Sequence, residues 1–283
     1  MLNHIMLATD FSTRSDRALR RATMLAREHG AALSLVHVID DDQPAHLIRA
    51  QTTASRVMLQ EVARTIAEFD GVPADITIQV GDVFSNILEA SEQVGADLIV
   101  LGAHRRQLRD IFVGTTAERI IVRSRIPVLM AAGVPASPYA RTLIALDTEE
   151  QSRSVVERVH ALAILRDSEI VAMHAFDAPA RGMMQRAMSE REAVDQYVAS
   201  EELRASRELA GLVAGTGLRT AQRKLSPVKG SAARAIMKCA LDEDAALIVV
   251  GTSQRQGLER FMLGSVAGDV LRDADRDVLV VPH

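Results

Sequence analysis

Aromatic residues, cysteine and net positive charge are all scarce in this chain of 283 residues. Aromatic residues make up 3% of it and tryptophan is absent, which disfavours the stacking platforms that bind single-stranded nucleic acid. The net charge of −4 provides no basic footprint for DNA or RNA. The single cysteine, Cys239, excludes an internal disulfide and fits a reducing cytoplasm, and its helical context favours a buried, inert thiol.

Long apolar runs and metal-binding spacings are missing as well. No run approaches the length of a membrane span, and Asp10 interrupts the first apolar segment too early for a signal peptide. No Cys/His spacing suggests a metal site. What remains is an ordinary globular composition, with 48% hydrophobic and 25% charged residues, in a chain long enough for two domains. We therefore expect a cytoplasmic protein that binds neither membranes nor nucleic acids.

The chain repeats itself. Four blocks recur in the same order. The first two pairs are HIMLATD and TLIALDT, around Asp10 and Asp147, and AALSLVHVID and SEIVAMHAFD, which end at Asp40 and Asp177. The other two are ADLIVLGA and AALIVVGT, around Gly102 and Gly251, and GTTAERIIVRSRIPVLM and GSVAGDVLRDADRDVLV, which begin at Gly114 and Gly264. The offset between the copies rises by 12 after the second block, which places an insertion between the second and third strands of the second copy. Such a repeat predicts two homologous halves.

Turn-forming residues in AAGVPASPYA mark the boundary between the halves. We predict a first domain over 1–133, a linker over 134–140 and a second domain over 141–283. The linker is short, so the halves should pack together as an intrachain pseudo-dimer.

Each half alternates strands and helices. In the first, we expect strands at 3–9, 32–39, 74–80, 97–101 and 127–132, and helices that include 13–29, 42–69 and 82–95. The nearly continuous apolar strands are typical of a parallel sheet covered by helices on both faces, so the fold class is α/β. In the second half, residues 181–215 read as one long amphipathic helix, with Met183, Met184 and Met188 as packing or partner contacts.

In an open parallel sheet, ligands bind beyond the carboxyl ends of the strands. The residues to inspect there are Thr9 and Asp10, Val38 and Gly102, with Asp147, Ala175 and Gly251 as their counterparts. A glycine-containing loop follows the fourth strand of each half and enters a helix, whose N-terminal N–H groups suit a phosphate. Thr115 and Ser265 either donate a hydroxyl to such an anion or only cap the helix. His37 and His174, at matching places in apolar strands, are expected to be core histidines with one satisfied ring nitrogen.

The segments GTSQRQGLERFMLGSVAGDVLRDADRDVLVV and HIMLATDFSTRSDRALRRATMLAREHGAALSLVHVID resemble the universal stress proteins, in a tandem arrangement that covers nearly the whole chain. The resemblance implies two Rossmann-like (adenine nucleotide alpha hydrolase-like) domains, each a five-stranded parallel sheet in the order 3-2-1-4-5, with the fifth strands pairing between the domains. Pairing of PVLMAA with DVLVV would then bury the two edge strands, which otherwise invite unwanted association. Some members bind ATP through G-x2-G-x9-G-[ST], an Asp at the end of the first strand and a Val after the second.

This chain departs from that pattern in both halves. In the second, Gln254 stands where the second glycine should be, although the spacing from there to Gly264, Ser265 and Val266 is kept. In the first, Arg105 takes that place and the spacing to Gly114 and Thr115 is one residue shorter. A side chain there would intrude on the approach of a phosphate. Arg105, with Arg106 and Arg109, could instead attract an anion or pair with Asp110 and Glu118.

The resemblance implies a non-catalytic stress-response regulatory module with degenerate ATP sites, of which the second-half loop is the better spaced. The cofactor would be ATP, with Mg²⁺ present only where ATP is bound. Two alternatives stay open: an interaction protein with vestigial sites, and a slow ATP hydrolase. A homodimer and an unidentified protein client are compatible with the sequence.

Overall fold

The computed structural model describes residues 1–103, 115–147, 151–187, 190–216, 222–228, 230–252 and 263–282. Several residues singled out from the sequence lie outside these ranges, namely His104, Arg105, Arg106, Arg109, Asp110, Gly114, Met188 and Gln254. Within the described ranges, none of the helices combines the length and apolar character that crossing a membrane requires.

The first half alternates strands and helices as its sequence predicts. Its elements are β1 His4–Ala8, α1 Thr13–His29, β2 Ala32–Ile39, α2 Ala45–Asp70, β3 Ala74–Val80, α3 Val83–Gln93, β4 Leu98–Gly102, α4 Thr116–Arg123 and β5 Val128–Ala131. Local chemistry sets the helix ends. Ser12 and Asp82 accept hydrogen bonds from backbone N–H groups at the starts of α1 and α3, and Gly30 ends α1 at a φ of 63°.

The second half repeats this order with one additional helix. Its elements are β6 Arg141–Ala145, α5 Gln151–Leu162, β7 Glu169–Phe176, α6 Ala180–Arg186, α7 Arg191–Gly215, β8 Gln222–Pro227, α8 Ala232–Asp242, β9 Leu247–Gly251, α9 Ser265–Asp273 and β10 Asp277–Val281. The additional element lies between β7 and β8, where the repeat offset predicts an insertion.

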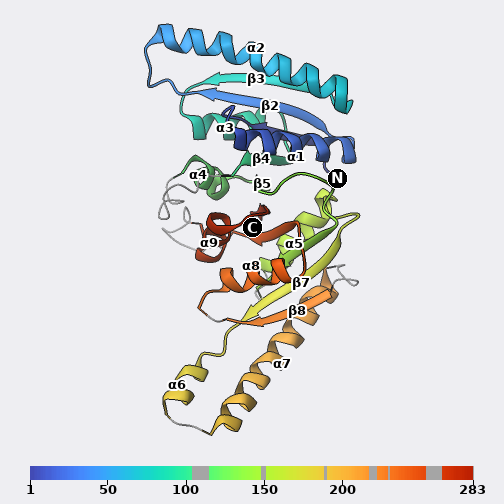
Figure 1. Cartoon of the computed structure of the whole chain (residues 1–283), viewed down its shortest axis with the longest axis vertical. Helices are drawn as coiled ribbons and strands as arrows, with labels where there is room; N and C mark the ends of the chain where they lie inside the picture. Colours follow the sequence, from blue (N-terminus) through green and yellow to red (C-terminus); the bar gives the residue numbers. More distant parts are fainter. Residues whose placement is uncertain are drawn as a thin grey trace.

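The prediction of a single long helix over 181–215 is wrong. Two helices, α6 and α7, stand there, and α6 lies beside the far end of α7 (Figure 1). α6 ends at Arg186, and Glu190, whose ψ of 136° is not helical, stands directly before α7. The Tyr197 hydroxyl on α7 then accepts a hydrogen bond from the Ala180 N–H at the start of α6. Met183 on α6 remains 63% exposed.

All ten strands form one sheet, in the order β3-β2-β1-β4-β5-β10-β9-β6-β7-β8. Each half contributes its strands in the predicted 3-2-1-4-5 order, and within each half the pairs are parallel. The halves meet at an antiparallel pair, in which Leu129 of β5 lies opposite Leu279 of β10. The expected pairing of the two edge strands is therefore confirmed.

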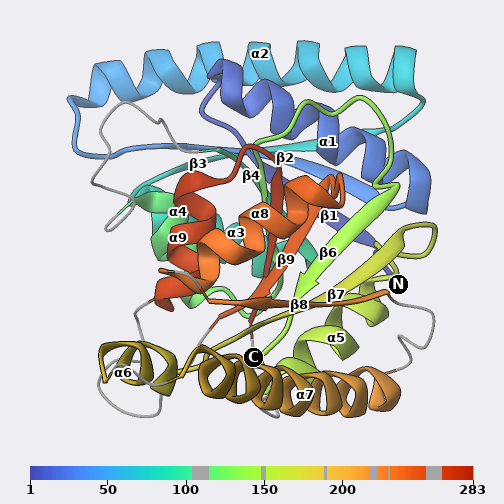
Figure 2. The same cartoon turned by 60° about the horizontal axis from the view of Figure 1, so that its bottom comes forward.

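Helices cover both faces of the sheet. Buried side chains of α1, α2, α5 and α7 pack on one face, and those of α3, α4, α8 and α9 pack on the other. Two views of the molecule show α4 and α9 next to each other beside the junction of the halves (Figures 1 and 2). The helices that follow the fourth strand of each half are therefore neighbours.

A buried charge network holds the junction together. Asp277, at the start of β10, accepts hydrogen bonds from the Arg21 Nε on α1 at 2.8 Å and from the Tyr139 hydroxyl at 2.6 Å. Its other oxygen accepts from the backbone N–H groups of Ala132 and Gly133. The Arg21 guanidinium also stacks 4.2 Å from the centroid of the Tyr139 ring. Burial, followed by the Asp277 charge, raises the Tyr139 pKa well above its usual value, so this hydroxyl stays a donor.

Candidate functional site

The turn after β1 is built by hydrogen bonds among its own residues. The Asp10 carboxylate accepts from the Ser15 hydroxyl at 2.6 Å and from the Ser12 N–H at 3.0 Å. The Thr9 hydroxyl accepts from the N–H of Phe11, a residue whose φ of 57° lies in the left-handed region. These bonds fix the direction in which the chain leaves the sheet and enters α1.

The Asp10 carboxylate is held in its ionised form. Partial burial acts to raise its pKa, but hydrogen bonds from Ser12 and Ser15 and the charge of Arg14, 3.6 Å away, outweigh burial and lower it. The carboxylate is thus an exposed anion whose hydrogen bonds are made within its own turn. A ribose or adenine group would have to share it with the two serines.

The second half repeats part of this geometry. The Asp147 N–H donates to the Ser152 hydroxyl at 2.8 Å, as the Asp10 N–H donates to that of Ser15 at 3.3 Å. Residues 148–150 lie outside the described ranges, so only the two ends of this turn can be compared. The serine five residues beyond each aspartate was missed in the sequence, although its recurrence in both copies is a readable signal.

The second strands support both turns in the same way. The Nδ1 atom of His37 lies 2.8 Å from the Thr9 carbonyl oxygen, and that of His174 lies 2.9 Å from the Leu146 carbonyl oxygen. The two histidines are therefore structural residues with one partnered nitrogen, as predicted. Val38 is buried in the core on the α3 and α4 face, and its counterpart Ala175 packs against that core.

Gly102, at the end of β4, allows a close approach of α1. A Cβ atom there would lie 3.0 Å from the backbone carbon of Arg14 and 3.1 Å from the backbone nitrogen of Ser15. This contact brings the end of β4 beside the turn that carries Thr9 and Asp10. Packing thus gives a reason for glycine at this position that does not involve a phosphate.

The helices after the two candidate loops begin differently. In the first half, the Thr115 hydroxyl accepts from the Glu118 N–H at 3.1 Å and so caps α4. In the second half, Gly264 stands at the cap position of α9 without a side-chain hydrogen bond, and Ser265 is the first helical residue. Both Ser265 and Val266 are exposed. Of the two alternatives for these hydroxyls, Thr115 acts as a cap and Ser265 does not.

Thr252, directly after β9, was missed by reasoning from the sequence. Its side chain is 7% exposed, and among the described residues its hydroxyl has no hydrogen-bond partner, which is costly for a buried polar group. Its counterpart in the first half, Ala103, packs on the α3 and α4 face. Because alternate residues of a strand point to opposite faces, Thr252 belongs on the matching α8 and α9 face. The gain of a hydroxyl over alanine at a repeated position is the signal that could have revealed it.

The described residues therefore place Thr9, Asp10, Val38, Gly102 and Thr115 at or beyond the carboxyl ends of the first-half strands. The corresponding set in the second half is Asp147, Ala175, Gly251, Gly264, Ser265 and Val266. The remaining residues of the predicted phosphate loops, Arg105, Gly114 and Gln254, lie outside the described ranges.

Two other kinds of site, a metal centre and a reactive thiol, can be assessed within the described ranges. No three His, Cys, Asp or Glu side chains gather there in a way that could hold a metal ion. Cys239 on α8 is half-buried, and burial raises the pKa of its thiol, which keeps it protonated at neutral pH.

Comparison with known proteins assigns the family. The family model for the universal stress protein family matches residues 1–132 and again residues 138–282, so the chain belongs to this family and carries two copies of its domain. A universal stress protein of Mycolicibacterium smegmatis is 25% identical, with 98% of this chain and 96% of the relative covered. Universal stress protein A homolog 1 of Coxiella burnetii is 30% identical over 42% of this chain and 88% of its own length.

A solved structure shares the tandem fold over its full length. The crystal structure of a universal stress protein from Archaeoglobus fulgidus aligns with a TM-score of 0.73 and 21% identity, and covers 100% of this chain and 99% of that one. The sheet and its helices are thus those of a tandem universal stress protein.

Proposed function

We propose that this protein is a non-catalytic stress-response regulator that senses an adenine nucleotide, ATP with its Mg²⁺, through the second-half site. The observation that carries the proposal is a contrast between the halves in two places: the residue that follows the fourth strand and the cap of the next helix. In the second half, within the part of the chain that the structure describes, the Thr252 hydroxyl has no partner and no side chain caps α9. In the first half, Ala103 replaces the threonine and Thr115 already caps α4.

This contrast matters because a phosphate binds at a helix N-terminus through unpaired backbone N–H groups. A capped helix has one of those groups occupied, whereas the uncapped α9 leaves it for a ligand. A buried hydroxyl without a partner likewise gains a hydrogen bond when an oxygen acceptor arrives. The second half therefore offers an anion more than the first half does, in agreement with its better loop spacing.

A second candidate function, an interaction protein with vestigial sites, has observations in its favour in the first half. The Asp10 carboxylate is taken up by Ser12, Ser15 and Arg14, and Gly102 has a packing role that needs no ligand. On this view neither half binds nucleotide, and only the fold has been kept. We also propose that the first domain ends at residue 133 and that the second begins at residue 141. Expressing each half alone would test these limits.

The decisive experiment begins with protein purified without added nucleotide. The protein is denatured, the released small molecules are identified, and fresh protein is titrated calorimetrically with ATP and Mg²⁺. We expect binding that Gly264→Val abolishes and the matched Gly114→Val leaves in place. Thr252→Val should weaken binding about tenfold, because one hydrogen bond to a charged group is lost.

No released nucleotide and no heat at millimolar ATP would leave the interaction protein as the better account. Phosphate release during the titration, measured in parallel, would identify a slow ATP hydrolase. Equal loss of binding in both glycine variants would contradict the assignment of the site to the second half.

A further inference from the structure

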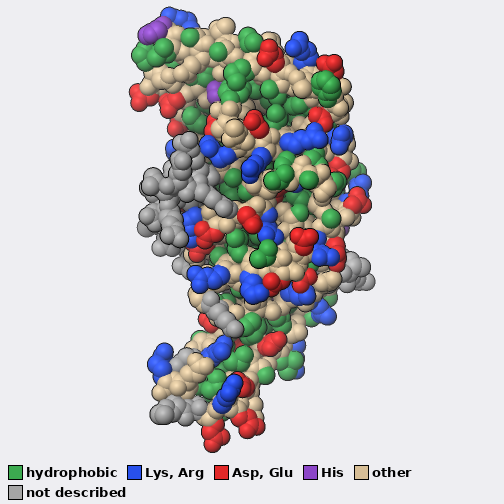
Figure 3. Space-filling view, in the orientation of Figure 1, with side chains coloured by type: hydrophobic (Ala, Val, Ile, Leu, Met, Phe, Trp, Pro, Cys, Tyr) green, Lys and Arg blue, Asp and Glu red, His purple; other side chains and the backbone are tan. Residues whose placement is uncertain are grey.

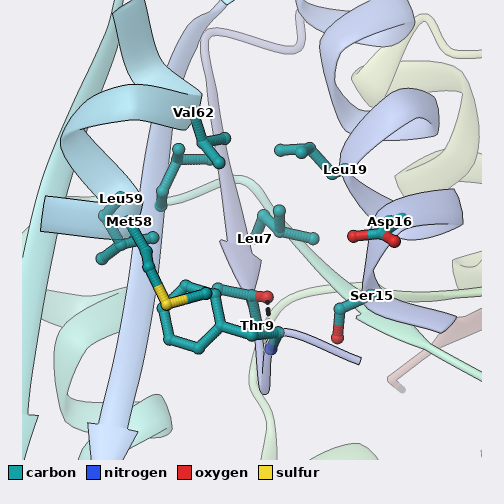
Figure 4. A pocket seen from close by; sticks show the side chains of 10 residues that line it. Leu7, Thr9, Ser15, Asp16, Leu19, Met58, Leu59 and Val62 are labelled. Carbon is teal, nitrogen blue, oxygen red and sulfur yellow. Dashed lines mark hydrogen bonds between the residues drawn. The ribbon is translucent and has the colours of Figure 1, made fainter. Parts of the chain in front are cut away.

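A hollow of about 120 Å³ lies beneath α2 in the first half, on the face of the sheet that α1 and α2 cover. Its lining is largely hydrocarbon, from Leu7 and Leu35 on the sheet, Leu19 on α1, and Leu59 and Val62 on α2 (Figure 4). Protein interiors rarely leave space larger than a water molecule. An apolar cavity of about 150 Å³ can hold benzene, so this space suits a compact hydrocarbon group.

The polar side chains of the lining differ in whether they already have a hydrogen-bond or ion-pair partner. The Thr9 hydroxyl accepts from the Phe11 N–H, and the Ser15 hydroxyl donates to Asp10, so both are partnered within the protein. Asp16 is different: among the described residues its exposed carboxylate has no hydrogen-bond donor and no ion-pair partner. It lies on the α1 side of the hollow, across from Met58 and Leu59 on α2 (Figure 4).

The mouth of the hollow can adjust to a guest. Met58 is 44% exposed at this place, and its unbranched thioether side chain adopts many conformations at little cost. The lining contains no basic side chain, so Asp16 is the one charge that a guest would meet within it. An apolar space with a carboxylate at its rim matches a molecule with a hydrocarbon body and a positively charged head.

The second half shows that the fold alone does not create this arrangement. The counterpart of Asp16 is Arg153, as Asp147 is the counterpart of Asp10. The Arg153 guanidinium lies against Gly215 of α7, where a Cβ atom would come within 2.7 Å of its Nη1. In that half a long basic side chain spans from α5 to α7. The carboxylate beside an open hollow is therefore particular to the first half.

We propose that this hollow is a binding site for a small organic cation, whose hydrocarbon body lies between Leu7 and Val62 and whose protonated amine meets the Asp16 carboxylate. The site is separate from the nucleotide site of the second half. It shares only Thr9 with the candidate residues of the first half.

The test uses the full chain with ¹³C-labelled leucine and valine methyl groups, titrated with benzylammonium chloride. Benzyl alcohol is the uncharged probe of similar shape. We expect saturable shifts of the Leu7, Leu35, Leu59 and Val62 methyl signals with both probes, and tighter binding of the cation. Asp16→Asn should weaken benzylammonium binding about 1.5- to fivefold, the range for an exposed ion pair, and leave benzyl alcohol unchanged.

Two further variants make the result specific. Glu68→Gln removes an exposed carboxylate of α2 that does not line the hollow, and it should leave both affinities unchanged. Val62→Phe fills the hollow and should abolish binding of both probes, with circular dichroism to verify folding. If that variant is unfolded, Val62→Leu fills less of the space and should weaken both probes together.

Three outcomes would overturn the proposal. The first is the absence of methyl shifts at the hollow with either probe. The second is an equal effect of Asp16→Asn on the cation and the alcohol, which would leave an apolar void without charge selection. The third is benzylammonium binding that persists in a folded, hollow-filling variant, because the cation would then bind elsewhere.

Discussion

The helices α1 and α5 occupy equivalent places in the two halves but contact different partners. Arg21 on α1 is buried against Asp277, whereas its counterpart Arg158 on α5 is exposed and donates to the Arg125 carbonyl at 3.2 Å. The partner position differs too, because Asp277 has Pro127 as its counterpart, which has no side-chain acceptor. The duplicated fold thus keeps its topology while placing a buried ion pair on one side of the junction only. Equivalent backbones have acquired unequal roles.

The largest expected effect comes from breaking this asymmetry with Arg21→Ala. The change leaves the Asp277 carboxylate buried without its cation, which costs about 3–5 kcal/mol of unfolding free energy. The matched Arg158→Ala removes an exposed contact and should cost no more than about 0.5 kcal/mol. Urea unfolding of both variants measures the difference. Similar losses in the two would mean that the buried network adds nothing beyond an ordinary surface contact.

An intermediate effect is expected for Gly102→Ala. The new methyl group would press on the backbone of Arg14 and Ser15, at 3.0–3.1 Å, which should destabilise the protein by about 1–3 kcal/mol. Thermal unfolding without nucleotide checks this. If the glycine served only the approach of a phosphate, the variant would unfold like the parent and lose only ATP binding. Gly251→Ala in the second half shows whether the repeated glycine has the same role.

The smallest effects concern two caps at equivalent positions, Asp82 of α3 and Ser231 of α8. Asp82 accepts from both the N–H and the hydroxyl of Ser85, at 2.9 and 2.6 Å, while Ser231 accepts from the Arg234 N–H alone, at 3.3 Å. At neutral pH, Asp82→Ala should cost about 1–1.5 kcal/mol and Ser231→Ala about 0.5–1 kcal/mol. Denaturant unfolding of the two single variants measures both values.

The two caps should also differ in how their contribution to stability depends on pH. The hydrogen bonds from Ser85 lower the Asp82 pKa below its ordinary value of 3.8. Its stabilising contribution is therefore complete above that value and is lost as the pH falls through the lower pKa of the folded state. The cost of Asp82→Ala should shrink below about pH 4, whereas that of Ser231→Ala should not change, because serine does not titrate there. A pH-independent cost at Asp82 would contradict an ionic cap.

Sequence pattern predicted most of the fold because the signals involved are local. The apolar runs gave the strands at 32–39 and 74–80 with the bounds that the structure has, and the resemblance to the universal stress proteins implied the order of the sheet in each half. The break between α6 and α7 was missed because helical periodicity continues across it. The hydrogen bond from the Ala180 N–H to the Tyr197 hydroxyl joins the two helices in the folded chain, and no local pattern indicates it.

The candidate site was predictable in its position but not in the state of its groups. Strand ends and loop spacing indicated where Asp10, Thr115 and Ser265 would lie. Whether each has a free lone pair depends on neighbours such as Ser15 and Glu118, which only geometry identifies. The Arg21–Asp277 pair joins residues from opposite ends of the chain, and no local pattern connects them.

The antiparallel pair of β5 and β10 also has a consequence for synthesis of the chain. β10 is the last strand in chain order, yet it lies in the middle of the sheet. While the ribosome is still making the second half, a folded first half presents the unpaired edge of β5, which is apolar and open to association with other chains. Completion of β10 closes that edge and brings Asp277 to Arg21. A chain truncated before residue 277 would therefore be left with this apolar edge of β5 unpaired.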